Sequence, residues 1–154
     1  MDKVVELYMP VAGQIIPLSE INDYLIENTV DGAGVGIIPN GDIFFAPVSG
    51  KVVMVSDTLN SVAINTKNNI TILIHGGMDT AKLEGRGFGM YVRTGDKVTV
   101  GDKLFFMDRD YVELTAKLTT PLIITTPHKI ASFNVDYDVK SAFVKFMDIH
   151  VVKE

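Results

Sequence analysis

The fold of this chain is decided by one stretch, Ile70-Thr71-Ile72-Leu73-Ile74-His75-Gly76-Gly77-Met78-Asp79-Thr80. Its apolar first half predicts a strand near the core, and its glycine pair ends that strand directly after a histidine. Residues 61–65 form another candidate strand, and residues 66–69 have the composition of a turn between the two. The sequence therefore predicts a hairpin that carries His75 at the end of its second strand.

The rest of the chain has the composition of a small β protein. Thirteen glycines and six prolines separate short runs of valine, isoleucine and phenylalanine, as expected of strands joined by tight turns. One clear helix is predicted, from Asp108 to about residue 119, because Tyr111, Leu114 and Leu118 recur at helical spacing. No linker or charge block divides the 154 residues. We therefore expect a single all-β domain over residues 1–154, with one or two short helices.

Two glycine-containing segments define further backbone features. The alternate glycines of residues 30–39 are not followed by a helix pattern, so a phosphate-binding loop is not expected there. They are predicted instead to let the backbone approach another strand closely. Asn40-Gly41 predicts a hairpin turn.

A weak internal repeat is present. Met9-Pro10-Val11-Ala12-Gly13-Gln14 is echoed by Ala46-Pro47-Val48-Ser49-Gly50-Lys51, and an apolar strand pattern follows each copy. The repeat predicts two similar elements that cross the same core.

The charge pattern limits the classes of partner. The net charge is −5, and the lysines and arginines are never clustered, which argues against nucleic acid or an anionic membrane surface as the main partner. No apolar run approaches the roughly 20 residues of a membrane helix, and the N-terminus has no signal-peptide pattern. The absence of cysteine excludes disulfides and thiol chemistry. We expect a cytoplasmic protein without membrane insertion.

His75 has two interpretations on spacing alone. It is a strand-end histidine whose ring is satisfied by a backbone carbonyl, or it is a nucleophile held at a rigid strand end. Reversible phosphoryl capture needs one ring nitrogen fixed by an acceptor and the other free. In that interpretation the N–H groups of Gly76 and Gly77 would cradle the phosphoryl oxygens, and Asp79 would have its own hydrogen-bond partners.

Other chemistries lack their residues. There is no Gly-x-Ser-x-Gly elbow and no pair of histidines at metal-binding spacing, and His128 and His150 are expected at the surface. No cofactor or metal is expected. A biotinyl or lipoyl carrier domain is set aside because the chain has no Met-Lys-Met hairpin and is about twice the expected size.

The stretch around His75 resembles the active-site signature of the glucose-type IIA component of the bacterial phosphoenolpyruvate-dependent sugar phosphotransferase system. Three aliphatic residues precede the histidine, and Gly77, Met78, Thr80 and Ala81 follow it at the family's positions. Further matches follow the family's order along the chain, including residues 10–13, 34–39, 46–51, 83–88 and 100–102 and Thr120-Pro121. The resemblance implies an antiparallel β-sandwich or barrel-like fold.

The resemblance also implies roles for four residues. His75 would accept the phosphoryl group, Asn60 stands where the family has a second histidine, Thr58 matches a family threonine, and Asp79 matches a family aspartate. Gly76 replaces an apolar residue and is expected to weaken partner docking. Asn60 can hydrogen-bond a phosphoryl oxygen through its amide but cannot become cationic, so we expect slower onward transfer.

Two functions are therefore carried forward. The first is a phosphocarrier that accepts a phosphoryl group from an HPr-like protein on His75 and passes it to the IIB domain of a sugar permease. The second is a regulatory binding module that has kept the fold, lost phosphotransfer, and docks a transporter or a metabolic enzyme. Regulated transporters or kinases are further partners that the resemblance implies.

Overall fold

The computed structural model describes residues 3–21 and 33–153. The described elements run in the order β1 (Val4–Tyr8), β2 (Gly13–Pro17), η1 (Leu18–Glu20), β3 (Gly34–Pro39), β4 (Ile43–Phe45), β5 (Gly50–Val55), β6 (Ser61–Asn65), β7 (Thr71–His75), η2 (Ala81–Leu83), β8 (Phe88–Met90), β9 (Lys97–Val98), β10 (Lys103–Met107), α2 (Arg109–Val112), β11 (Thr120–Ile124), η3 (Pro127–Lys129), β12 (Ile130–Val135) and β13 (Lys145–Val151). The all-β prediction is confirmed. Within the described ranges, no helix is both long and apolar enough to cross a bilayer.

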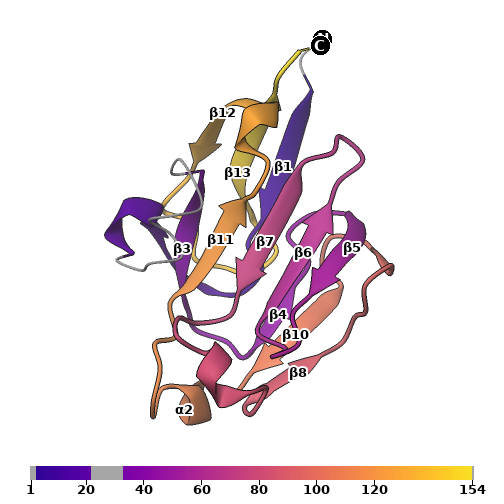
Figure 1. The fold of residues 1–154 in the computed structure, drawn as a ribbon. Coiled ribbons are helices and arrows are strands. Elements are labelled where there is room, and N and C mark those ends of the chain that lie inside the picture. The colour runs from indigo at the N-terminus through magenta and orange to yellow at the C-terminus, as the bar shows by residue number, and fades with distance from the viewer. Residues whose placement is uncertain (1–2, 22–32, 154) are drawn as a thin grey trace.

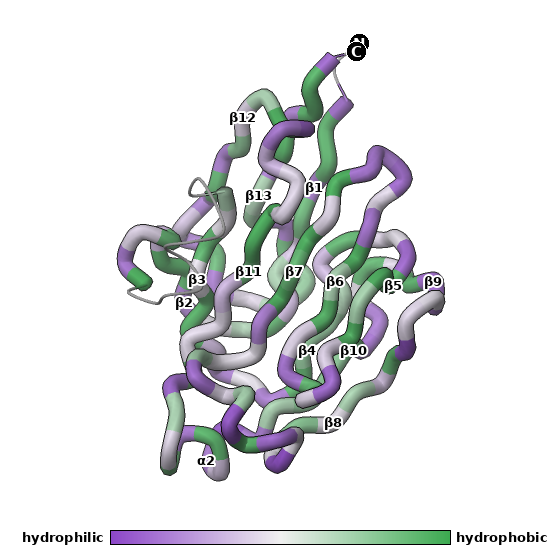
Figure 2. Tube along the Cα trace, in the orientation of Figure 1, coloured by the Kyte–Doolittle hydropathy of each residue, from purple (hydrophilic) through white to green (hydrophobic). Residues whose placement is uncertain are grey.

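The strands form one large sheet and two small ones, all with antiparallel pairing (Figure 1). The seven-stranded sheet has the order β2-β3-β11-β7-β6-β5-β9, and the three-stranded sheets have the orders β1-β13-β12 and β4-β10-β8. One apolar cluster takes residues from all three sheets, such as Ile72, Phe105 and Met147, so the sheets enclose a common core. Figure 2 shows the apolar residues concentrated along the strands and hydrophilic residues at the turn between β6 and β7.

The predicted hairpin is present and lies at the centre of the large sheet. Strand β7 is the fourth of seven and pairs with β6 in a register that places Ser61 opposite His75. Ile72 and Ile74 are buried in the core, whereas Leu73 and His75 are only half-buried. Because side chains alternate along a strand, His75 projects from the outer face of the sheet, away from the main core.

The internal repeat is confirmed as a pseudo-symmetric crossing. The N–H of Tyr8 donates to the carbonyl of Pro47 (2.9 Å), and the N–H of Phe45 donates to the carbonyl of Pro10 (2.8 Å). In each case the residue two before the proline of one copy bonds the proline carbonyl of the other copy. The two copies therefore hold each other by equivalent hydrogen bonds.

The glycines of the repeat explain why its pattern is constrained. Gly13 begins β2 and Gly50 begins β5, and a Cβ at either position would overlap a carbonyl oxygen of the neighbouring strand. The glycine pattern of residues 30–39 works in the same way where it is described, since a Cβ at Gly34 would overlap the carbonyl of Leu122. The predicted close approach of strands is confirmed there, and residues 22–32 lie outside the described residues.

The hairpin predicted at Asn40-Gly41 is wrong. This turn connects β3, in the seven-stranded sheet, to β4, which pairs with β10 in a different sheet. Asn-Gly favours a tight reversal, but the local signal does not determine which strand the chain joins next. The turn instead carries Asp42, whose carboxylate accepts a hydrogen bond from Nε of Arg109 (2.6 Å).

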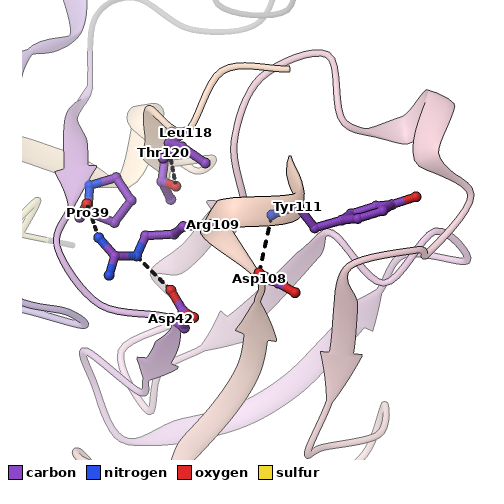
Figure 3. A network of polar contacts seen from close by, with 7 residues as sticks. All are labelled: Pro39, Asp42, Asp108, Arg109, Tyr111, Leu118 and Thr120. Carbon is purple, nitrogen blue, oxygen red and sulfur yellow. Dashed lines mark hydrogen bonds and ion pairs between the residues drawn. The ribbon is translucent and has the colours of Figure 1, made fainter. Parts of the chain in front are cut away.

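The helix predicted from Asp108 is present but far shorter than expected. Asp108 caps it by accepting from the N–H of Tyr111, and Arg109 reaches Asp42 and the carbonyl of Pro39 (Figure 3). The helix α2 ends at Val112, and Leu114 is 75% exposed. The chain then forms an antiparallel bridge with the segment after His75, which requires extended backbone and ends the helix.

Candidate functional site

His75 is held through one ring nitrogen. Its Nδ1 lies 2.8 Å from the carbonyl oxygen of Gly77. Because a carbonyl oxygen only accepts hydrogen bonds, Nδ1 carries the proton, and Nε2 of the neutral ring keeps a free lone pair. The ring is partly exposed at the outer face of the sheet. The two interpretations of His75 are thus compatible, since the same carbonyl that satisfies Nδ1 leaves Nε2 available as a nucleophile.

A mostly buried apolar cluster lies on the same side of the seven-stranded sheet as His75. A small cluster separate from the main core occupies this side and consists of Leu18, Ile21, Met78 and Ile123, with Ile16 and Leu73 packed against it. Leu73 is two residues before His75 on the same strand face, and Met78 follows the histidine by three residues. The imidazole is therefore presented beside apolar side chains rather than in a closed polar cleft.

The N–H groups of the glycine pair are engaged inside the protein. Gly76 donates to the carbonyl of Asn60 (2.6 Å), and Gly77 donates to Oγ1 of Thr120 (3.1 Å). Both glycines are buried. The prediction that these N–H groups cradle phosphoryl oxygens is wrong, because the turn folds back onto the ends of β6 and β11 and uses its donors there.

Asn60 is a buried hydrogen-bonding centre. It is 2% exposed. Its Oδ1 accepts from the hydroxyls of Ser56 (2.8 Å) and Thr58 (2.7 Å), and its Nδ2 donates to the hydroxyl of Thr80 (3.0 Å). The amide that was expected to reach a phosphoryl oxygen is therefore directed into the protein. The side chains of Thr58 and Asn60 bond to each other, and the Asn60 carbonyl accepts from the N–H of Gly76 in the turn after His75.

Asp79 lies at the exposed edge of this site. Its carboxylate pairs with Lys82 at 3.0 Å, and the two side chains are 77% and 46% exposed. The expectation that Asp79 has its own hydrogen-bond partner is confirmed. An exposed pair of this kind contributes little to stability, so its charge remains available to an approaching partner.

The other histidines lie elsewhere. His128 belongs to η3, and His150 lies on β13 in a separate sheet, with its Nε2 3.4 Å from Nδ2 of Asn134. Among residues 3–21 and 33–153, no group of three or more histidine, aspartate or glutamate side chains is arranged to hold a metal ion.

Sequence reasoning gave no role to two buried threonines of the site. Thr80 and Thr120 are both fully buried, and each bonds the turn that follows His75. Thr80 belongs to the signature around His75, and Thr120 lies in a matching Thr-Pro pair. The only available signal was their position in a family pattern, because spacing does not show that β11 reaches the histidine turn.

Comparison with known proteins identifies the family. A family model described as phosphoenolpyruvate-dependent sugar phosphotransferase system, EIIA 1, matches residues 5–130. The chain belongs to this family. Its members are phosphocarriers that accept a phosphoryl group from HPr and pass it to a IIB domain.

Relatives and a solved structure agree with this assignment. The chain is 32% identical over 137 residues to the glucose-specific EIIA component of Staphylococcus epidermidis, covering 88% of this chain and 82% of that protein. It is 39% identical over 130 residues to the corresponding component of Oceanobacillus iheyensis, covering 83% and 78%. The glucose permease IIA structure from Mycoplasma capricolum superposes with a TM-score of 0.85 at 30% identity, covering 95% and 96%. The antiparallel sandwich implied by the sequence resemblance is thereby confirmed.

The position of Gly76 corrects one expectation about this EIIA domain. A Cβ at Gly76 would lie 2.9 Å from Cε2 of Phe105 and 3.0 Å from Cε1 of Phe88. The position therefore faces the interior and not an approaching protein. The expectation that Gly76 weakens partner docking by removing a surface contact is wrong, and the glycine instead relieves crowding beneath the histidine turn.

Proposed function

We propose that His75 is the phosphoacceptor of this EIIA domain, taking a phosphoryl group from HPr and delivering it to the IIB domain of a sugar permease in the cytoplasm. The observation that supports this assignment is the hydrogen bond between Nδ1 of His75 and the carbonyl of Gly77. It fixes the proton on Nδ1 and leaves the Nε2 lone pair directed away from that bond. We also propose that residues 1–154 act as one domain.

The transfer would proceed by in-line displacement at Nε2. The Nε2 lone pair forms a bond to phosphorus while the bond from phosphorus to the donor's leaving atom breaks, and its electron pair stays with the donor. The Nδ1 proton stays in place throughout. The ring gains positive character when Nε2 is phosphorylated, so the hydrogen bond to the Gly77 carbonyl becomes charge-assisted and stronger. Passing the group to IIB reverses these steps.

The binding-module alternative gains less support from the site. It rests on Asn60, which cannot supply a cation beside the phosphoryl group. The buried network around Asn60 instead bonds to the turn after His75, which supports a role in holding the histidine in place. Docking of transporters or kinases would use the surface around the partly exposed His75.

Intact-protein mass spectrometry tests the assignment. Incubation with HPr, phosphoenolpyruvate and the kinase that phosphorylates HPr from phosphoenolpyruvate should add one acid-labile phosphoryl group to the wild-type chain. The same incubation should add none to a His75→Ala variant. His128→Ala and His150→Ala serve as matched controls and should be labelled like wild type. Labelling of His75→Ala, or no labelling of the wild type under conditions that label a two-histidine relative, would refute the proposal.

A further inference from the structure

One peptide group beside His75 is bonded at both of its ends by buried threonines. The carbonyl of Gly76 and the N–H of Gly77 belong to the same peptide plane. The hydroxyl of Thr80 donates to that carbonyl (2.8 Å), and the hydroxyl oxygen of Thr120 accepts from that N–H (3.1 Å). Both threonines are fully buried, so water does not compete for these bonds.

The direction of each bond is set by a second partner. The hydroxyl of Thr120 donates a hydrogen bond to the carbonyl of Leu118 (3.0 Å; Figure 3). Its oxygen is therefore left to accept from the N–H of Gly77. The hydroxyl of Thr80 donates a hydrogen bond to the carbonyl of Gly76 and accepts one from Nδ2 of Asn60. A hydroxyl has one proton and can satisfy both roles only in this arrangement. The peptide plane is therefore held in a single orientation.

The next carbonyl along the chain is the one that binds His75. Gly77 has a φ of 70°, and its carbonyl oxygen accepts from Nδ1 of the histidine. The direction of this carbonyl follows from the preceding peptide plane and from the bond between the N–H of Met78 and the carbonyl of Lys117 (2.9 Å). Rotation of the Gly76–Gly77 plane would move the acceptor that keeps the proton on Nδ1.

We propose that Thr80 and Thr120 are positioning residues for phosphoryl transfer. They fix the Gly76–Gly77 peptide plane, which aims the Gly77 carbonyl at Nδ1 and keeps Nε2 of His75 unprotonated and in place. Asn60 belongs to the same hydrogen-bond network, since it donates to Thr80 and accepts from Ser56 and Thr58. This inference rests on the proposed role of His75, and it assigns Asn60 to the support of the histidine turn instead of to contact with the phosphoryl group.

The state of the ring provides a test that does not depend on phosphoryl transfer. In the unphosphorylated full chain, ¹⁵N NMR at a pH where the ring is neutral should show Nδ1 protonated and Nε2 unprotonated. Thr120→Val and Thr80→Val remove the hydroxyls at nearly constant volume and should shift the ring toward a mixture of tautomers. Thr120→Ser and Thr80→Ser keep the hydroxyls and should restore the wild-type ring spectrum.

The rate of phosphoryl transfer should also distinguish the valine variants from the serine variants. With phospho-HPr as donor, the valine variants should lose roughly tenfold or more in kcat with little change in KM, because transfer is sensitive to small displacements of a reacting atom. The serine variants should remain close to wild type. A purely structural role for these threonines would lower the stability without changing the tautomer or the ratio of kcat to KM.

Thr66→Val is the matched control. Thr66 is also buried, and its hydroxyl accepts from the N–H groups of Asn68 and Ile70 at the opposite end of the same hairpin. This variant should lose comparable stability while keeping the wild-type ring spectrum and transfer rate. An equal effect of Thr66→Val on the ring would overturn the proposal.

Three further outcomes test the proposal and separate it from the proposed function. A folded Thr120→Val variant with wild-type ring shifts and kcat overturns the proposal even if His75 accepts phosphoryl groups normally. If the valine variants do not fold, the wild-type Gly77 amide hydrogen should still exchange as slowly as the paired amides of β7, and rapid exchange overturns the proposal. A chain with the expected ring spectra but no phosphoryl capture would refute the proposed function alone.

Discussion

The carbonyl oxygen of Gly77 lies 2.8 Å from Nδ1 of His75, and Gly77 adopts a left-handed backbone conformation to place it there. The two groups are only two positions apart in sequence, so the turn itself supplies the acceptor. A small change in the turn backbone should therefore alter the histidine directly, without any change in its own surroundings on the sheet.

Gly77→Ala should impair both stability and phosphoryl capture. A Cβ at Gly77 would lie 2.6 Å from the carbonyl oxygen of Lys117, and the left-handed backbone alone costs alanine about 1–2 kcal/mol. Urea unfolding and the rate of labelling by phospho-HPr measure the two effects. Gly89→Ala is the control, because its Cβ would meet only ordinary contacts, the nearest at 3.9 Å. Equal labelling rates for the two variants would contradict the role of the Gly77 carbonyl.

Gly76→Ala should destabilise the fold by overpacking, at a cost of about 1–3 kcal/mol. The added methyl group would press on Phe105, which is fully buried, and on Phe88, which is only half-buried. Phe88→Leu should therefore reduce the cost of Gly76→Ala when the two changes are combined. A double-mutant cycle from unfolding free energies measures this coupling. An identical cost in both backgrounds would show that the alanine does not face Phe88.

The sequence predicted those parts of the fold that depend on local patterns. The alternation of residues 61–65 and 70–74 predicted the central hairpin, and the repeated Pro-Val-x-Gly pattern predicted two related elements, because each pattern acts over a few neighbouring residues. The helix after Asp108 was overestimated because its end is set by a bridge between Met78 and Lys117, which are far apart in sequence. Helical spacing is a local pattern, so it cannot show a contact with a residue that is distant in sequence.

The site was predicted in outline for the same reason. The glycine pair was correctly associated with His75, but its N–H groups were wrongly assigned to a phosphate. Their real partners, Asn60 and Thr120, come from β-strand ends brought together only by the sheet. Pairing of strands distant in sequence thus determined which donors remained free, and no pattern within the histidine stretch could show it.

Asp79→Asn should change partner binding more than stability. Its carboxylate is 77% exposed and pairs with the half-exposed Lys82, so loss of the pair should alter the unfolding free energy by less than about 1 kcal/mol. Removing a negative charge at the edge of the histidine face should raise KM for phospho-HPr and leave kcat unchanged, with a smaller difference at high salt. Asp138→Asn, on the exposed loop after β12, is the control for net charge. A fall in kcat at unchanged KM would contradict a docking role.

Asn60→His should raise the rate of onward transfer to a IIB domain. The change places a group that can become cationic beside the histidine turn, and phosphoryl transfer spreads negative charge that such a group stabilises. In the neutral ring, one nitrogen can donate to Thr80 and the other can accept from Thr58, so the variant can keep these bonds before transfer, whereas the cationic ring gives up the bond from Thr58. Single-turnover transfer from the phosphorylated chain measures the effect, with Asn60→Gln as the control that keeps an amide. An unchanged rate in a folded Asn60→His variant would show that Asn60 limits nothing in donation, and that its contribution is confined to holding Thr80 and the turn.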